Sequence, residues 1–283
     1  MKKIVLPTDF SQTAMNAIRY AAKLFENDFC RFYILHAYQQ DIYESGILVT
    51  KETFSEVAKT ANQNSLVQLR KVLKQIKQHA PNPKHNYKII SADNILVDEV
   101  DKIVEERDID IIVMGTRGKT NDKKLTFGSH TLQVLKYVKC PVLVIPQDYE
   151  YTAPKKVVFS TDFSMPYQKR ELLFLSELIS GYQSQIAVLY VSEMKKLSLR
   201  EEKNKHFIEE NFNTKNTSFI TIDGKNVVKT INSYIKNHTP DLLVMINRRH
   251  SFLENILFQD TINKIGLTIT IPFLVLQNIR RNS

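Results

Sequence analysis

Cysteine is scarce in this chain, and the usual metal-binding spacings are absent. The 283 residues hold two cysteines, Cys30 and Cys140, and neither stands in a Cys-x-x-Cys or Cys/His spacing. Both lie in or beside apolar segments, which predicts buried thiols in a reducing compartment. The seven histidines form no His-x-x-x-His pair. The sequence therefore predicts neither a disulfide framework nor a zinc site.

Targeting and membrane-spanning segments are also missing from the sequence. Only three apolar residues separate Lys3 from Pro7, too few for the core of a signal peptide. No apolar run approaches the roughly 20 residues that a membrane-spanning helix needs. We therefore expect a cytoplasmic protein that does not contact a membrane.

The net charge is +9, and the Lys and Arg residues are scattered along the chain. Such an excess could attract nucleotides, nucleic acid or an anionic membrane surface. The sequence contains no evident recognition helix and no alternation of aromatic and basic residues. We therefore expect a solvated basic surface, and nucleic acid is not an expected partner.

The first half of the chain alternates strand and helix patterns. An apolar run ends at Pro7, and Ser11 then offers an N-cap to a segment whose apolar residues recur at helical spacing up to Phe25. The alternation continues to residue 145, except over residues 40–52, which show no clear periodicity. This order predicts an α/β, Rossmann-like, doubly wound unit, in which helices flank a five-stranded parallel sheet. Further helices are expected at residues 54–79, 96–104 and 129–138, and strands at residues 4–6, 32–37, 87–90, 110–114 and 142–145.

A second copy of this pattern comes after the first. The letters Thr-Asp-Phe-Ser at residues 8–11 return at residues 161–164, an offset of 153. Residues 110–114 and 241–245 correspond at an offset of 131, so the second unit is 22 residues shorter. The lost residues are expected in the irregular stretch after the second strand and in the long helix behind it. We predict two tandem units of one fold, residues 1–148 and 154–283.

Spaced glycines come after the fourth strand of the first unit. Gly115 and Gly118 stand directly behind the apolar run, and Gly128 with Ser129 opens the next helix. Glycine lets backbone N–H groups come close to an anion, and a helix N-terminus adds partial positive charge. The pattern predicts a loop that holds phosphate.

Two well-known phosphate motifs do not fit this loop. Gly118-Lys119-Thr120 resembles the end of a P-loop, but Val113 stands where a P-loop requires its first glycine. The dinucleotide fingerprint Gly-x-Gly-x-x-Gly comes after the first strand of its unit, where this chain has Thr8 and Asp9. Both motifs are excluded.

In open α/β sheets, ligands bind at the carboxyl ends of the strands. Pro7-Thr8-Asp9, Ala37-Tyr38 and the glycine loop all stand at such strand ends, so together they would hold a nucleoside at one end and phosphates at the other. Asp9 could accept hydrogen bonds from ribose hydroxyls or an exocyclic amine. Because its counterpart Asp162 persists where the glycines do not, a structural role for Asp9 in the turn stays open beside ligand contact. His36, at the end of an apolar strand, is expected to be a core histidine.

These motifs resemble the universal stress protein family. Its ATP-binding members carry the pattern G-x2-G-x9-G-[ST], which matches residues 115–129, and a Pro-Val-Leu-Val-Ile-Pro strand comes next at residues 141–146. Residues 7–11 and 35–37 are similar to that family's first strand-to-helix turn and second strand end. The resemblance covers nearly the whole chain, twice. It implies a stress-related protein that binds ATP or another adenine nucleotide and pairs through its fifth strand. The two units are expected to pair with each other, and a homodimer stays open, because closed two-fold symmetry is the usual outcome. Mg²⁺ and Mn²⁺ both stay open as accompanying ions.

The resemblance also assigns residues to the nucleotide site. Pro7, Thr8 and Asp9 would line the adenosine end, and Ala37 would meet the adenine through its backbone. The residues assigned to the ribose and the phosphates are Met114, Gly115, Arg117, Gly118, Gly128, Ser129, His130 and Thr131.

The second unit lacks this glycine pattern. At the offset of 131, Ile246, Arg249 and Gln259 replace the three glycines, and Asp260 replaces Ser129. Added side chains would block a close approach to phosphate, and a carboxylate would repel it. The sequence therefore predicts one nucleotide site, in the first unit.

The sequence leaves three functions open. The first is a nucleotide-binding regulatory protein, the second a slow ATPase or phosphate-transferring enzyme, and the third an interaction module whose second unit docks a partner. The sequence places no general base, no second metal-binding carboxylate and no activated nucleophile. No catalytic residue is therefore assigned.

Overall fold

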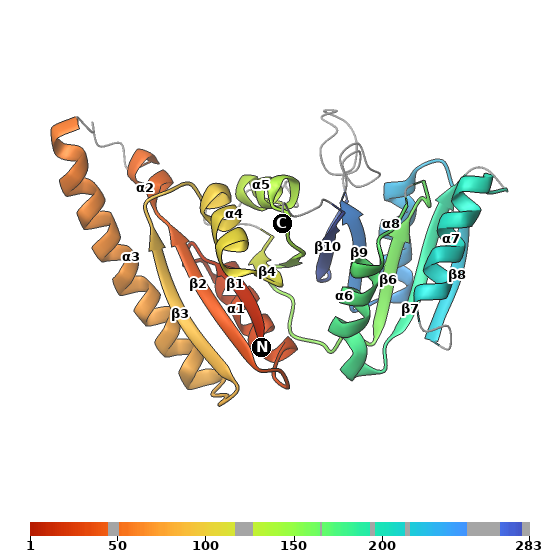
Figure 1. Ribbon diagram of the computed structural model, residues 1–283, viewed down its shortest axis with the longest axis horizontal. Coiled ribbons are helices and arrows are strands. Elements are labelled where there is room, and N and C mark those ends of the chain that lie inside the picture. The colour runs from red at the N-terminus through yellow and green to blue at the C-terminus, as the bar shows by residue number, and fades with distance from the viewer. Residues whose placement is uncertain are drawn as a thin grey trace. The chain divides into compact units, whose positions relative to one another are not determined.

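The computed structural model describes residues 1–44, 51–116, 127–164, 166–192, 196–212, 216–247 and 267–278. The chain divides into two compact units, Met1–Tyr151 and Thr152–Ser283, and each is an α/β unit in which helices pack on a sheet (Figure 1). No helix within the described ranges is long and apolar enough to cross a membrane.

The first unit holds a parallel sheet of order β3-β2-β1-β4-β5. Its elements are β1 (Lys2–Pro7), α1 (Gln12–Leu24), β2 (Cys30–Ala37), α2 (Gln39–Glu44), α3 (Lys51–His79), β3 (His85–Ala92), α4 (Leu96–Arg107), β4 (Ile111–Gly115), α5 (Ser129–Tyr137) and β5 (Val142–Ile145). Helices α1 and α3 pack against one face of the sheet, and α4 and α5 pack together on the other. The predicted fold class is confirmed. Helix α2 was not predicted from the sequence, because its six residues are too few to show a period.

Helix α1 begins where its sequence predicts. The Ser11 hydroxyl oxygen accepts a hydrogen bond from the Ala14 backbone N–H at 3.2 Å, which caps the first turn. The apolar residues Ala14, Ile18 and Ala21 recur at helical spacing, and all are buried against the sheet.

The second unit repeats the architecture with the sheet order β10-β9-β6-β7-β8. Its elements are β6 (Lys156–Thr161), α6 (Lys169–Ile179), the short 3-10 helix η1 (Ser180–Tyr182), β7 (Gln185–Ser192), α7 (Leu199–Asn211), β8 (Thr217–Asp223), α8 (Val227–His238), β9 (Leu242–Asn247) and β10 (Phe273–Gln277). In both units the chain adds its second and third strands outward from the first, and then adds the fourth and fifth on the other side of the first.

The second unit is shorter where the sequence predicts. In the first unit, 47 residues separate the end of β2 from the start of β3, whereas 24 separate β7 from β8. Most of the difference is in the helix that crosses between the strands, because α3 has 29 residues and α7 has 13.

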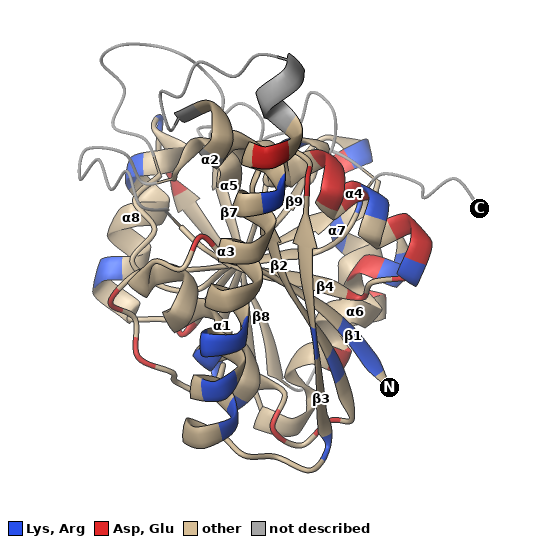
Figure 2. Cartoon of the chain, turned by 90° about the vertical axis from the view of Figure 1, so that its left-hand side faces the viewer, with Lys and Arg blue, Asp and Glu red and all other residues tan. Residues whose placement is uncertain are grey.

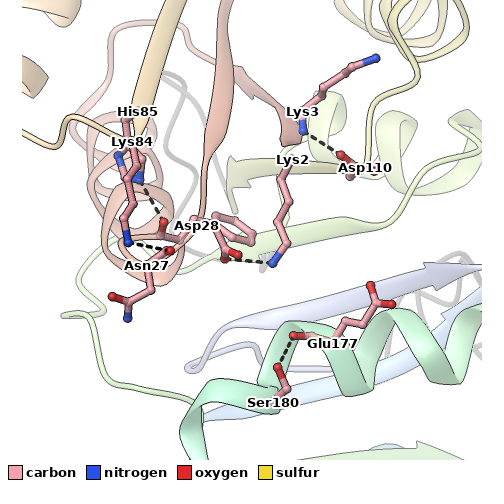
Figure 3. A network of polar contacts seen from close by, with 10 residues as sticks. Lys2, Lys3, Asn27, Asp28, Lys84, His85, Asp110, Glu177 and Ser180 are labelled. Atoms are coloured by element: carbon pink, nitrogen blue, oxygen red, sulfur yellow. Dashed lines mark hydrogen bonds and ion pairs between the residues drawn. The ribbon is translucent and has the colours of Figure 1, made fainter.

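A repeated aspartate fixes the start of the first strand in each unit. The Asp110 carboxylate accepts a hydrogen bond from the Lys3 backbone N–H at 2.7 Å (Figure 3). Its counterpart Asp241 accepts one from the Lys156 backbone N–H at 2.8 Å. In each unit the bond satisfies a backbone N–H group at the start of the first strand. This shared role explains why the aspartate is present in both copies of the repeat.

The predicted burial of both cysteines is confirmed. Cys30 and Cys140 are both free and buried. Burial, with a smaller contribution from the Asp28 carboxylate, raises the pKa of the Cys30 thiol to about 12. The thiol is therefore protonated at neutral pH and is a poor nucleophile.

Candidate functional site

The candidate site of the first unit lies at the switch point of the sheet. Strand β1 pairs with β2 on one side and β4 on the other, and the chain reverses its direction of strand addition between β1 and β4. The register pairs Ile4 with Ile111 and Val5 with Ile112; continued at the same offset past the end of β1, it puts Thr8 level with Gly115. Ligands of open α/β sheets bind outside the carboxyl ends of the strands at such a point. The Thr8–Asp9 turn follows β1 and the glycine loop begins at the end of β4, so both predicted ligand-binding segments lie there.

The turn after β1 is held by its own side chains. Phe10 has a φ of 66°, a left-handed conformation that is unfavourable for a bulky residue. Its N–H donates to the Thr8 hydroxyl oxygen at 3.0 Å. One Asp9 carboxylate oxygen accepts from the Ser11 N–H at 3.1 Å and from the Ser11 hydroxyl at 2.6 Å. The structural role predicted for Asp9 is thus present, while its contact with a ligand stays a prediction.

Gly115 ends β4 beneath the first turn of α1. A Cβ atom built on Gly115 would lie 2.6 Å from Thr13 Cγ2 and 3.2 Å from the Thr13 carbonyl carbon and oxygen. These distances are below ordinary van der Waals contact, so a larger residue fits only if the Thr13 side chain and the adjacent backbone of α1 shift. Gly115 therefore has a packing role that is independent of any phosphate.

The two ends of the glycine loop meet each other. The Thr116 N–H donates to the Ile145 carbonyl at 3.0 Å, and the Gly128 N–H donates to the Thr116 carbonyl at 2.8 Å. Gly128 is the N-cap of α5 with φ −73° and ψ 159°, a conformation that any residue adopts, and it offers no side chain to cap the helix. The predicted site residues Arg117 and Gly118 lie outside the described residues.

The first turn of α5 is fastened to the strands around it. The buried Thr131 hydroxyl donates to the Gly115 carbonyl at 3.0 Å. Its proton is therefore already used, and only its oxygen remains as an acceptor. His130 Nε2 lies 2.5 Å from Gln40 Oε1 of α2. No sequence signal indicated this contact, because residues 39–44 show no helical period.

The strand ends that are predicted to line the adenosine end are supported by a buried network. Ala37 pairs with Ala92, and Met114 is buried in β4. The ring of His36 lies 4.4 Å from that of Phe10, and its Nδ1 is 2.9 Å from the Ser65 hydroxyl oxygen of α3. His36 is 5% exposed, so the prediction of a core histidine is confirmed.

Tyr38 stands next to Ala37 at this strand end. Its pKa is raised from the ordinary value, chiefly by burial and to a smaller extent by the negative charge of Asp93. The phenol is therefore a hydrogen-bonding group that stays neutral throughout the physiological range.

The second unit has the same turn after its first strand, β6, but the helix that follows the turn, α6, begins later. Phe163 has a φ of 52° and its N–H donates to the Thr161 hydroxyl oxygen at 3.0 Å, as in the first unit. However, α6 begins at Lys169, four residues later than the repeat predicts from α1. Pro166 lies in the intervening segment, and proline disfavours a helical conformation in the residue before it.

A pocket is lined by the end of β6 together with Pro166 and Tyr167, which precede α6. Ile246 stands in the place of Gly115 and lines this pocket. Ser160, which is 3% exposed, also lines it, and its hydroxyl has no hydrogen-bond partner among the described residues. Burial raises the pKa of Tyr167, another lining residue, whose hydroxyl bonds that of Thr161. Of the other residues that differ from the glycine pattern, Arg249, Gln259 and Asp260 lie outside the described residues.

Replacing Ser160 by Ala is expected to leave the free energy of unfolding of the second unit unchanged within about 0.5 kcal/mol, or to raise it, because no hydrogen bond is lost. The matched control is Ser184→Ala. The Ser184 hydroxyl is also buried and donates to the Pro154 carbonyl at 2.5 Å, so its loss is expected to cost about 1–2 kcal/mol. Urea denaturation measures both. An equal loss in the two variants would mean that Ser160 has a partner in the pocket.

No group of three or more His, Cys, Asp and Glu within the described ranges is arranged to hold a metal ion. The groups that could bind a ligand here are the backbone N–H groups at the start of α5, the Asp9 carboxylate and the strand-end carbonyls. This set suits a nucleotide better than a bare cation, because helix N-terminal N–H groups favour phosphate.

Comparison with known proteins identifies the family. The family model described as "Universal stress protein family" matches residues 1–146 and 155–277. The chain is 30% identical over 152 residues to Universal stress protein MJ0577 of Methanocaldococcus jannaschii, an alignment that covers 51% of this chain and 94% of that protein. Universal stress protein MJ0531 of the same organism is also 30% identical over 152 residues, with 51% of this chain and 81% of that protein covered.

A solved structure shows a similar fold over nearly the whole chain. The crystal structure of a universal stress protein from Archaeoglobus fulgidus DSM 4304 matches with a TM-score of 0.69. The superposition covers 97% of this chain and 96% of that chain. At 18% identity this likeness concerns the fold alone. The chain belongs to the universal stress protein family and carries two of its domains in tandem.

Proposed function

We propose that the chain is a regulatory protein that binds one adenine nucleotide, ATP foremost, in its first unit. The observation that carries the proposal is that the Thr8–Asp9 turn and Gly115 stand at the carboxyl ends of the neighbouring strands β1 and β4, at the switch point of the sheet. The start of α5, which Gly128 leaves without a side-chain cap, provides N–H groups for the phosphates. The family's nucleotide motif, which the sequence matches in the first unit, supports the same assignment.

The proposed arrangement gives each group a task. The Asp9 carboxylate, oriented by its bonds to Ser11, would accept from ribose hydroxyls. The backbone at Ala37 would face the adenine, and the N–H groups of Ser129 and His130 would face the phosphates. Pairing of the units through their fifth strands, a homodimer and an accompanying Mg²⁺ or Mn²⁺ belong to the same proposal. A slow hydrolysis of ATP is the second candidate, and no described residue is placed as its general base.

The test is to identify and count the nucleotide. Mass spectrometry of ligand released from freshly purified full-length protein, followed by calorimetric titration with ATP, ADP and AMP, is expected to give one equivalent per chain. Two equivalents would contradict the assignment to the first unit alone, and the absence of any binding would remove the proposal. Incubation of bound ATP with and without Mg²⁺, followed by chromatography, separates binding from hydrolysis.

A further inference from the structure

Helix α3 carries a different charge from its counterpart in the second unit. Residues 57–92, which include most of α3 and all of β3, hold seven Lys or Arg and no Asp or Glu. Helix α7, at the equivalent place, is balanced by four glutamates, and Lys205 and His206 pair with Glu209 and Glu210. The positive charge is thus concentrated on the crossover between β2 and β3, whose counterpart between β7 and β8 is shorter.

The cations of α3 point to solvent on one side of the helix. Arg70, Lys71, Lys74 and Lys77 are all exposed, and within the described ranges no ion pair involves any of the four. Their spacing of three and four residues places neighbouring side chains about 5–6 Å apart. Figure 2 shows Lys and Arg recurring along this part of α3, without an acidic residue beside them on the helix. We call these four residues the basic face of α3.

From this geometry we infer that the basic face of α3 binds the phosphate backbone of nucleic acid without reading its sequence. Residues 70–77 span about 11 Å of helix axis, the length of about three nucleotide steps at 3.4 Å per step along a strand. Exposed amides alternate with the cations at Gln68, Gln75 and Gln78, and amide N–H groups donate to phosphate oxygens. A backbone-binding surface needs neither a recognition helix nor interleaved aromatic residues.

The apolar side of α3 argues against a membrane as the partner. Leu69, Val72 and Ile76 are each at most 5% exposed, because α3 packs against β3 and β2. A helix that binds a bilayer inserts an apolar face between the headgroups, and α3 has already used its apolar face in the fold.

The experiment compares two triple variants of the full-length chain with the parent. Arg70→Gln, Lys74→Gln and Lys77→Gln remove three cations of the basic face. The control, Lys203→Gln, Lys225→Gln and Lys229→Gln, removes three exposed cations from the second unit and changes the net charge equally. Binding to a fluorescein-labelled DNA duplex of 20 base pairs, of two unrelated sequences, is measured by anisotropy between 50 and 200 mM NaCl.

The parent is expected to bind both duplexes equally and more weakly as salt rises. The α3 variant is expected to bind at least about tenfold more weakly at 50 mM salt, with a slope of log K against log salt that is flatter by about 2–3 units, at about 0.9 per phosphate contact. The control is expected to change affinity less than twofold. Equal losses in both variants, or no salt-dependent binding by the parent, would overturn the inference. So would α3-dependent binding to phosphatidylserine vesicles without binding to DNA. Circular dichroism melts of all three proteins show whether any loss arises from unfolding.

Discussion

Ser129→Asp is expected to weaken ATP binding by at least about tenfold while the protein stays folded. Ser129 is the first residue of α5, and it is exposed. A carboxylate in the first turn of a helix stabilises the helix by about 0.3–1 kcal/mol, so no loss of stability is expected. The same carboxylate would stand where the phosphates are proposed to bind, and even partly screened repulsion exceeds the 1.4 kcal/mol that a tenfold change requires.

The variant reproduces in the first unit the residue that the second unit already has, since Asp260 corresponds to Ser129. Ser129→Asn is the matched control, because it has nearly the same shape as Asp and no charge. Calorimetric titration with ATP and with adenosine separates the effects. ATP affinity is expected to fall in the Asp variant alone, and adenosine affinity is expected to change little in either. Unchanged ATP affinity in Ser129→Asp would place the phosphates elsewhere.

Gly115→Ala is expected to lower the free energy of unfolding of the first unit by about 2–3 kcal/mol, within the range for overpacked cores. The physical reason is the approach of α1. The new Cβ would meet Thr13 Cγ2 at 2.6 Å and the Thr13 backbone at 3.2 Å. Urea denaturation followed by circular dichroism measures the loss, and Gly115→Val is expected to lose more.

Two further variants decide whether the clash is the cause. Thr13→Ala removes Cγ2, so the double variant Gly115→Ala with Thr13→Ala is expected to recover part of the loss. Gly181→Ala, in the second unit, adds a Cβ that meets nothing within 4 Å and is expected to change stability by no more than about 1 kcal/mol. If Gly115→Ala unfolds like the parent and loses only ATP affinity, the glycine serves the ligand and not the packing.

The site was only partly predictable from the sequence. The strand ends were found from hydrophobic periodicity, and the rule for open sheets brought Thr8, Asp9 and Gly115 together. The contact of His130 with Gln40 was not predictable, because it joins segments 90 residues apart, one of which has no periodic signal. The later start of α6 does not follow from the repeat, because the four letters at residues 161–164 are those of the first unit. The place where the helix begins depends on the next few residues, Pro166 among them.

The sequence by itself determined that the chain has two α/β units, that the second has a shorter crossover, and that Gly115 has no glycine counterpart at Ile246. Periodicity and internal repetition contain that information, because a buried face and a turn impose their residue types locally. Only the tertiary structure decided what the glycine difference means. At Gly115 it is a close approach by Thr13 in the first turn of α1, whereas Ile246 lines a pocket with Pro166, which precedes α6 and is not helical. That distinction depends on the distance between a helix and a strand about 100 residues apart in the chain, which residue spacing cannot encode.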